Sequence, residues 1–164
     1  MENLYLKIID KFNANKSLFI KHAAPIVQHI DLYRGQPLAP DRFELFGLPA
    51  LFIEYNIDWE RGKVTISAHV VTDSTQSTSS ISPNRLTGLQ IFKLYKVVKH
   101  LLKGLSSETT GKLKLTSEHP IESDVVNYQV FDFEASIIET PLEDKFAEGT
   151  IESLNNNKKL RYSV

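Results

Sequence analysis

Two strand-like runs within residues 48–71 constrain the fold of this chain more than any other feature. In the first run, the apolar residues Leu51, Ile53 and Tyr55 recur at every second position. The second run repeats this period at Val64, Ile66, Ala68 and Val70. Gly62 stands just before the second run, where a tight turn needs a residue that tolerates positive φ. The pattern predicts a β-hairpin, and therefore an antiparallel sheet.

Two helices are expected beside this sheet. Residues 2–14 place apolar side chains on one face, and residues 86–103 form the strongest helical pattern in the chain. The apolar stripe of the second helix contains Leu94, Val98, Leu101 and Leu105, widened by Ile91, Tyr95 and Leu102. Ser82-Pro83 is typical of a helix start, and Gly104 is typical of a helix C-terminus.

The remaining runs add strands to the sheet. We expect strands over residues 26–33, 111–117 and 125–138, with a long irregular connection over residues 34–49 that is rich in glycine and proline. Bulky residues on both faces of 125–138 indicate a central strand. The sequence therefore predicts an α+β fold: a mostly antiparallel β-sheet with a long hairpin, packed on one face by two main helices.

Length and composition are those of one soluble domain. The chain has 164 residues, 41% of them hydrophobic, with a formal net charge of −1 and no cysteine. No run approaches the roughly 20 apolar residues that span a bilayer, and Met1-Glu2-Asn3 does not resemble the start of a signal peptide. We expect a main domain over residues 1–140, a C-terminal extension or arm over residues 141–164, and synthesis in a cytoplasm.

No residue pattern indicates catalysis or metal binding. The five histidines lack the spacing of metal ligands, and no nucleophile-elbow or phosphate-binding glycine motif is present. The carboxylates of Glu118, Glu122 and Asp124 are expected to be solvated in a loop around Pro120. The sequence thus predicts a protein that is not an enzyme and has no cofactor.

Several surface features indicate contacts with other macromolecules. Lys96, Lys99 and Lys103 share one helix face, which favours either a solvated surface or a contact with a polyanion. Trp59, at the expected turn, either folds back onto the core or anchors a partner. A Ser/Thr-rich tract and a β-prone tail also suggest contacts between copies. The candidate oligomer or partner interface comprises Trp59, Arg61, Asp73, Ser74, Thr75, Gln76, Leu160 and Tyr162.

The order of these segments resembles a family of small structural proteins of tailed bacteriophages, the tail terminator and tail completion (head–tail joining) proteins. The similarity covers about residues 1–140. It is carried by IVQHIDL at 26–32, LPALFIEY at 48–55, a strand ending HVV at 71, a helix ending LLKGL at 105, GKL at 111–113, and DVVNY at 124–128 continuing through Phe131 and Phe133.

This resemblance implies an α+β sandwich whose copies form a ring, commonly a hexamer. Such a ring caps the tail tube, stops its growth and joins it to the head connector, so the expected location is the virion, after assembly in the bacterial cytoplasm. The segment 48–71 and the loop after it would shape the lumen, through which genomic double-stranded DNA passes, or the axial contacts. The family has no catalytic residues to transfer. Two alternatives stay open: a neck or tail-barrel ring protein of a short-tailed phage, and a small DNA-binding accessory protein.

Overall fold

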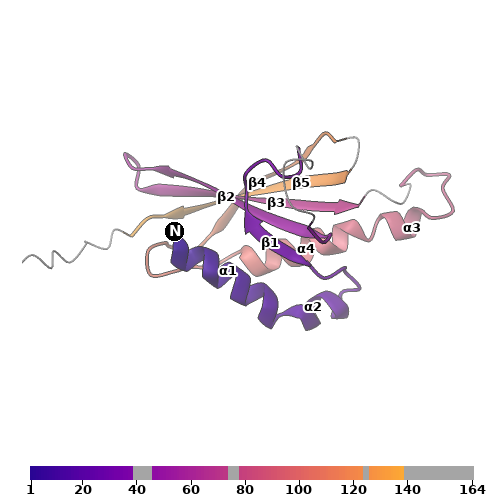
Figure 1. Ribbon diagram of the computed structural model, residues 1–164, viewed down its shortest axis with the longest axis horizontal. Helices are drawn as coiled ribbons and strands as arrows, with labels where there is room; N and C mark the ends of the chain where they lie inside the picture. The colour runs from indigo at the N-terminus through magenta and orange to yellow at the C-terminus, as the bar shows by residue number, and fades with distance from the viewer. Residues whose placement is uncertain (39–45, 74–77, 124–125, 139–164) are drawn as a thin grey trace, which may run out of the picture.

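A five-stranded sheet in the order β1-β2-β3-β5-β4 forms the centre of the protein (Figure 1). The computed structural model describes residues 1–38, 46–73, 78–123 and 126–138. The strands are β1 (His29–Leu32), β2 (Ala50–Asp58), β3 (Lys63–Asp73), β4 (Lys114–Ile121) and β5 (Val126–Ser136). Only β1 and β2 pair in parallel; the other three pairs are antiparallel. The predicted α+β class with a mostly antiparallel sheet is confirmed.

The register of β2 and β3 fixes which side chains face the helices. The two strands pair from Ala50 opposite Val71 to Asp58 opposite Lys63. The four residues 59–62, called the β2–β3 turn below, connect them, and Gly62 has a φ of +59°. Successive side chains of a strand point to opposite faces. In β3, therefore, Val64, Ile66, Ala68 and Val70 face the helices, and His69 faces the other side of the sheet.

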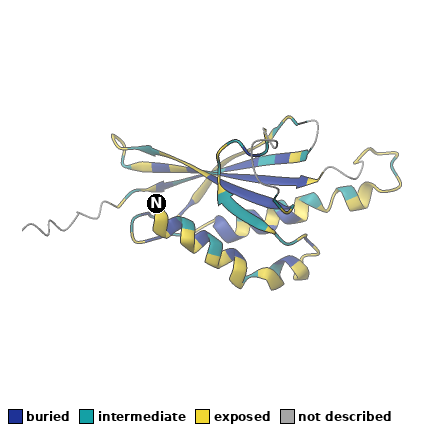
Figure 2. Cartoon of the chain, viewed as in Figure 1, coloured by how far each residue is buried: buried dark blue, intermediate teal, exposed yellow. Residues whose placement is uncertain are grey.

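The four helices of the described residues lie on one side of the sheet (Figure 1). They are α1 (Glu2–Ala14), α2 (Lys16–Lys21), α3 (Arg85–Gly88) and α4 (Ile91–Leu102). The main core lies between α1, α4 and this face, and Figure 2 shows the buried stripe along both helices. Its largest fully buried side chains include Phe19, Phe131, Phe133, Leu4, Ile8, Leu51, Ile66 and Leu94. A smaller apolar cluster, centred on Phe52, Tyr128 and Val130, lies on the opposite face.

The helix predicted over residues 86–103 is divided. Helix α3 has four residues and buries none of them, and α4 begins only at Ile91. Between them, Gln90 N donates to Thr87 O and Phe92 N donates to Leu89 O, the i to i+3 pattern of a tighter helix. Gly88 favours this interruption because glycine is a poor helix former. Gly104 follows the helix with a φ of +81°, as predicted.

The strand β4 lies at the free edge of the sheet, and it corrects one sequence prediction. Glu118 and Pro120, expected in a loop, are inside this strand. Proline is tolerated there because an edge strand does not need every N–H group for pairing. The register also shifts between Leu115 and Ser117, which places a β-bulge at Thr116. The edge is therefore irregular as well as exposed.

Candidate interaction surfaces

The β2–β3 turn exposes the single tryptophan at one end of the long axis (Figure 1). The backbone N–H of Arg61 donates to Asp58 Oδ1 at 3.0 Å, and the Arg61 guanidinium lies 3.6 Å from the same carboxylate. These contacts order the turn, yet Trp59 keeps 66% of its surface exposed. Trp59 therefore does not fold back onto the core in this structure.

Helix α3 and the start of α4 lie at the opposite end of the molecule (Figure 1), and this part of the chain also carries exposed apolar residues. We call Ile81, Leu86 and Phe92 the α3 patch; they are 91%, 77% and 61% exposed. Sequence reasoning missed this patch. One signal was available: Phe92 shares the lysine-rich face of the predicted helix, because Lys96, Lys99 and Lys103 follow it at helical spacing. An aromatic residue on a polar face indicates a contact outside the chain's own core.

A buried histidine lies at the centre of the sheet face that the helices leave open. His69 Nδ1 is 2.7 Å from the Tyr128 hydroxyl oxygen, and His69 Nε2 is 3.0 Å from Glu54 Oε2. The Tyr33 ring stacks on the imidazole with centroids 4.0 Å apart and planes within 3°. Burial lowers the pKa of His69, against the opposing effect of the Glu54 carboxylate. Burial and the hydrogen bond with Tyr33 raise the pKa of Tyr128, so the Tyr128 phenol stays protonated.

A carboxylate network lies beside this histidine. Asp132 accepts hydrogen bonds from the hydroxyls of Ser67 and Ser117, each at 2.6 Å, and His119 Nδ1 lies 3.8 Å away. Burial alone would raise the pKa of Asp132, but the two serine hydrogen bonds and the nearby histidines outweigh it and lower the pKa. Both nitrogens of His69 have partners, and the hydrogen bonds of His69 and Asp132 together link the four strands β2, β3, β4 and β5.

This network predicts a pH dependence of stability. The pKa of His69 is lower in the folded protein than its ordinary 6.5, so the unfolded chain binds the proton more readily. Stability is therefore complete above about pH 6.5 and declines as the pH falls from there toward the lowered pKa. We expect wild type to lose more stability between about pH 7.5 and 5.5 than His69→Gln, which retains polar atoms but does not titrate. Urea denaturation at each pH measures this; equal losses in the two proteins would contradict it. The contribution of the Asp132 carboxylate to the stability of the folded protein is lost only at lower pH, since the pKa of Asp132 is lowered from 3.8.

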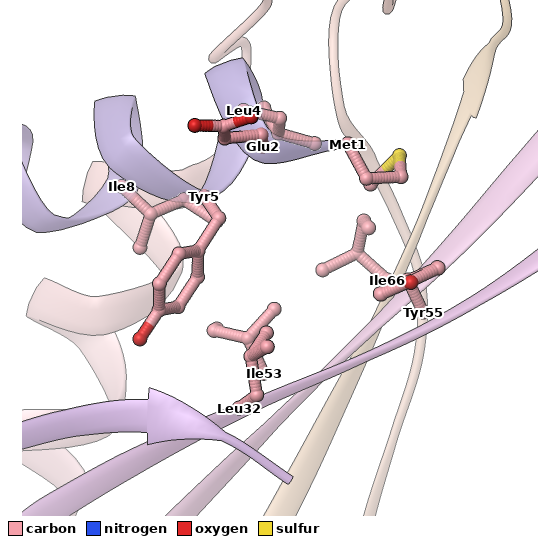
Figure 3. A pocket seen from close by; sticks show the side chains of 9 residues that line it. All are labelled: Met1, Glu2, Leu4, Tyr5, Ile8, Leu32, Ile53, Tyr55 and Ile66. Atoms are coloured by element: carbon pink, nitrogen blue, oxygen red, sulfur yellow. The ribbon is translucent and has the colours of Figure 1, made fainter.

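An apolar recess lies between the first half of α1 and strands β1 to β3 (Figure 3). Its volume is about 260 Å³, and its walls come mainly from aliphatic and aromatic side chains. The lining residues are Met1, Glu2, Leu4, Tyr5, Ile8, Leu32, Ile53, Tyr55 and Ile66. Burial and the Asp31 carboxylate raise the pKa of Tyr5. With one carboxylate and two phenols at its rim, the recess suits an apolar group better than it suits acid–base chemistry.

The three lysines predicted to contact a polyanion have different surroundings. Lys99 pairs with Glu118 of β4, and its ammonium also lies 5.4 Å from the centre of the Phe131 ring. Lys96 and Lys103 are exposed. Lys103 instead joins His100, Lys7 and Lys11 along a groove of about 340 Å³ between α1 and α4. The groove therefore combines basic groups from two helices, which the sequence did not bring together.

The other predicted interface residues are divided between described and undescribed parts of the chain. Asp73 is exposed at the end of β3, where its carbonyl oxygen accepts a hydrogen bond from Asn127 Nδ2 at 3.2 Å. Ser74, Thr75 and Gln76, together with Leu160 and Tyr162 of the C-terminal extension, lie outside the described residues. So does Asp124. Within the described residues, no three His, Asp or Glu side chains converge in a way that could hold a metal ion.

Comparisons with known proteins give no relative for this chain. No protein-family model matches the sequence, and neither a curated protein nor a solved structure matches it. None of the helices in the described ranges is long and apolar enough to cross a membrane.

Proposed function

We propose that this chain is a ring-forming structural subunit of a tailed bacteriophage, a tail terminator or tail completion protein. The observation that carries the proposal is the position of its exposed apolar side chains. Trp59 lies at one end of the long axis and the α3 patch lies at the other. Exposed apolar groups of this size are typical of surfaces that become buried on assembly. The resemblance of residues 1–140 to that family supplies the biological setting.

The mechanism of such a subunit is geometric. Two different surfaces at opposite ends allow head-to-tail contacts between copies. These contacts close into a ring when a whole number of the rotations that relate neighbouring copies adds up to a full turn. A ring, six-fold as the resemblance implies, would offer one rim to the tail tube and the other to the head–tail connector. Double-stranded DNA would pass through its lumen. No bond is made or broken in this role.

Two alternatives share part of this support. A neck or tail-barrel ring protein of a short-tailed phage would use the same end-to-end contacts and differ only in its axial partners. A small DNA-binding accessory protein would instead use the basic groove of Lys7, Lys11, His100 and Lys103. Its DNA affinity would fall steeply with salt, because each neutralised phosphate releases counterions.

Native mass spectrometry over a wide range of protein concentration tests the proposal. We expect monomer at low concentration and one dominant closed oligomer at high concentration, visible as rings by electron microscopy. A ladder of open oligomers without a preferred size would contradict the ring. A chain that stays monomeric throughout and binds DNA in a salt-sensitive manner would favour the accessory protein.

A further inference from the structure

A cleft lies at the same end of the molecule as the α3 patch; we call it the terminal cleft. It is formed where five segments meet: the α2–β1 connection, the residues just before β2, the end of β3, the α3–α4 segment and the start of β5. Its volume is about 570 Å³, within the roughly 300–1,000 Å³ of pockets that bind ligands. Its walls mix apolar and polar groups, including Ala24, Pro25, Pro49, Thr72, Thr87 and Ile91.

The terminal cleft contains an unpaired polar atom. Thr72 is only 5% exposed, and its Oγ1 has no hydrogen-bond partner among the described residues. A buried hydroxyl without a partner destabilises the folded chain, so most such groups in proteins are paired. Thr72 belongs to the wall of the cleft, and its Oγ1 is covered, so a molecule that enters the cleft and displaces the atoms over Oγ1 could supply the missing partner.

The side chain of Trp59 has the properties that this cleft requires. The indole combines a large apolar surface with one N–H group, which can only donate a hydrogen bond. Thr72 Oγ1 can accept it. Within one molecule the β2–β3 turn and the terminal cleft lie at opposite ends (Figure 1), so the indole must come from another copy.

Charged residues lie beside both surfaces. Among the described residues, Arg61 of the turn pairs with Asp58, which leaves Glu60 as the unpaired charge there, and Asp73 is the one acidic residue in the wall of the cleft. The exposed Glu60 follows Trp59 in the turn, whereas the exposed Arg85 and Lys93 flank the α3 patch. Arg85 also donates to Ser80 O at 2.9 Å, which holds the guanidinium at this end of the molecule. An acidic residue would thus meet basic residues when the turn docks at the cleft, which favours the correct orientation of two copies.

We propose that the Trp59 side chain of one copy inserts into the terminal cleft of the next copy, where its indole N–H donates to Thr72 Oγ1. The turn then covers the α3 patch. This inference rests on the proposed ring function and identifies the contact that would build the ring. A pocket that accepts an aromatic anchor at the centre of an interface is the typical setting of a binding hot spot.

Disulfide cross-linking tests this contact directly, because the chain contains no cysteine of its own. Glu60→Cys and Thr87→Cys place one thiol beside Trp59 and one at the rim of the cleft. When the two full-length variants are mixed and oxidised, we expect the mixed disulfide dimer to dominate. Glu60→Cys mixed with Asn13→Cys is the matched control, since Asn13 is exposed on α1 away from the cleft. Equal yields from the two mixtures would overturn the proposal.

Association strength gives a second, independent measurement. Trp59→Ala is expected to weaken association by about 30-fold or more, as for a hot-spot residue. Thr72→Val removes only the hydroxyl and is expected to weaken association by about tenfold. Its isolated chain should unfold at a slightly higher urea concentration, because an unpaired buried hydroxyl is gone. Thr65→Val, on an exposed position of the same strand, is the control and should change neither quantity.

The outcomes separate this inference from the proposed function. One outcome is a ring that forms although Glu60→Cys and Thr87→Cys do not cross-link preferentially and Thr72→Val associates as strongly as wild type. That result would overturn the Trp59 contact and leave the ring proposal in place. Absence of both oligomer and cross-link at every concentration would contradict the two proposals together. The intrinsic fluorescence of Trp59 adds a direct signal, since it is the only tryptophan: its emission should move to shorter wavelength as wild type assembles, and less so in Thr72→Val.

Discussion

Replacement of Phe131 by alanine is expected to lower the free energy of unfolding by about 3–5 kcal/mol. Phe131 is fully buried in β5, between the sheet and α4. Its ring packs edge-on against Tyr95, with centroids 5.5 Å apart, and the Lys99 ammonium lies over its face. Alanine would leave a cavity in the main core, and it would remove the aromatic contact as well. Urea or guanidinium denaturation measures the change.

Phe92 supplies the matched control for this prediction. It contacts the other side of Tyr95, with centroids 6.0 Å apart, but it is largely exposed. Phe92→Ala should therefore change the free energy of unfolding by no more than about 0.5 kcal/mol. Burial raises the pKa of Tyr95, between them, to about 12, so its phenol stays neutral throughout. Similar losses in both variants would show that Phe131 does not occupy the core as described.

Leu94→Ala is the second large expected effect, a loss of about 2–5 kcal/mol. Leu94 is fully buried in the first turn of α4, on the face that packs against the sheet. Its loss would weaken the contact between the sheet and α4, which buries five residues where α1 buries three. Most helical stability in proteins depends on such packing. Thermal and chemical unfolding, followed by far-UV circular dichroism, report the change.

Leu86→Ala separates folding from association. Leu86 belongs to the same predicted helix but lies in α3, which buries no residue. Its loss should leave the free energy of unfolding within about 0.5 kcal/mol of wild type, and it should weaken association if the α3 patch is covered in the ring. A large loss of stability on Leu86→Ala would mean that α3 belongs to the core after all.

The elements with strong local periodicity could be predicted from the sequence. The helix over residues 2–14 and the strand over 125–138 agree with α1 and β5 within two residues, because each has a long, regular apolar pattern. The bounds of the shorter elements differ more from the prediction. The strand expected over 26–33 is reduced to His29–Leu32, and Pro120 did not break its strand because β4 needs pairing on one side only.

The candidate surfaces could be predicted only in part. The sequence placed Trp59 beside a turn but left open whether its side chain folds back onto the core, and the structure shows it exposed. The terminal cleft could not be predicted, since its walls come from five segments and the sequence places Thr72 in the Ser/Thr-rich tract, whereas the structure includes it in β3. The His69 network was also missed: Tyr33 and Tyr128 are distant in sequence, and only the strand register brings them to the same imidazole.

The exposed edge strand β4 affects how readily the unassembled protein aggregates. A sheet margin with regular N–H and C=O groups invites other chains to add strands, which leads to fibrous aggregates. In β4 the bulge at Thr116 and the missing N–H of Pro120 interrupt that template twice within five residues. Freshly made copies can therefore accumulate to high concentration in a crowded cell without templating fibres along this margin.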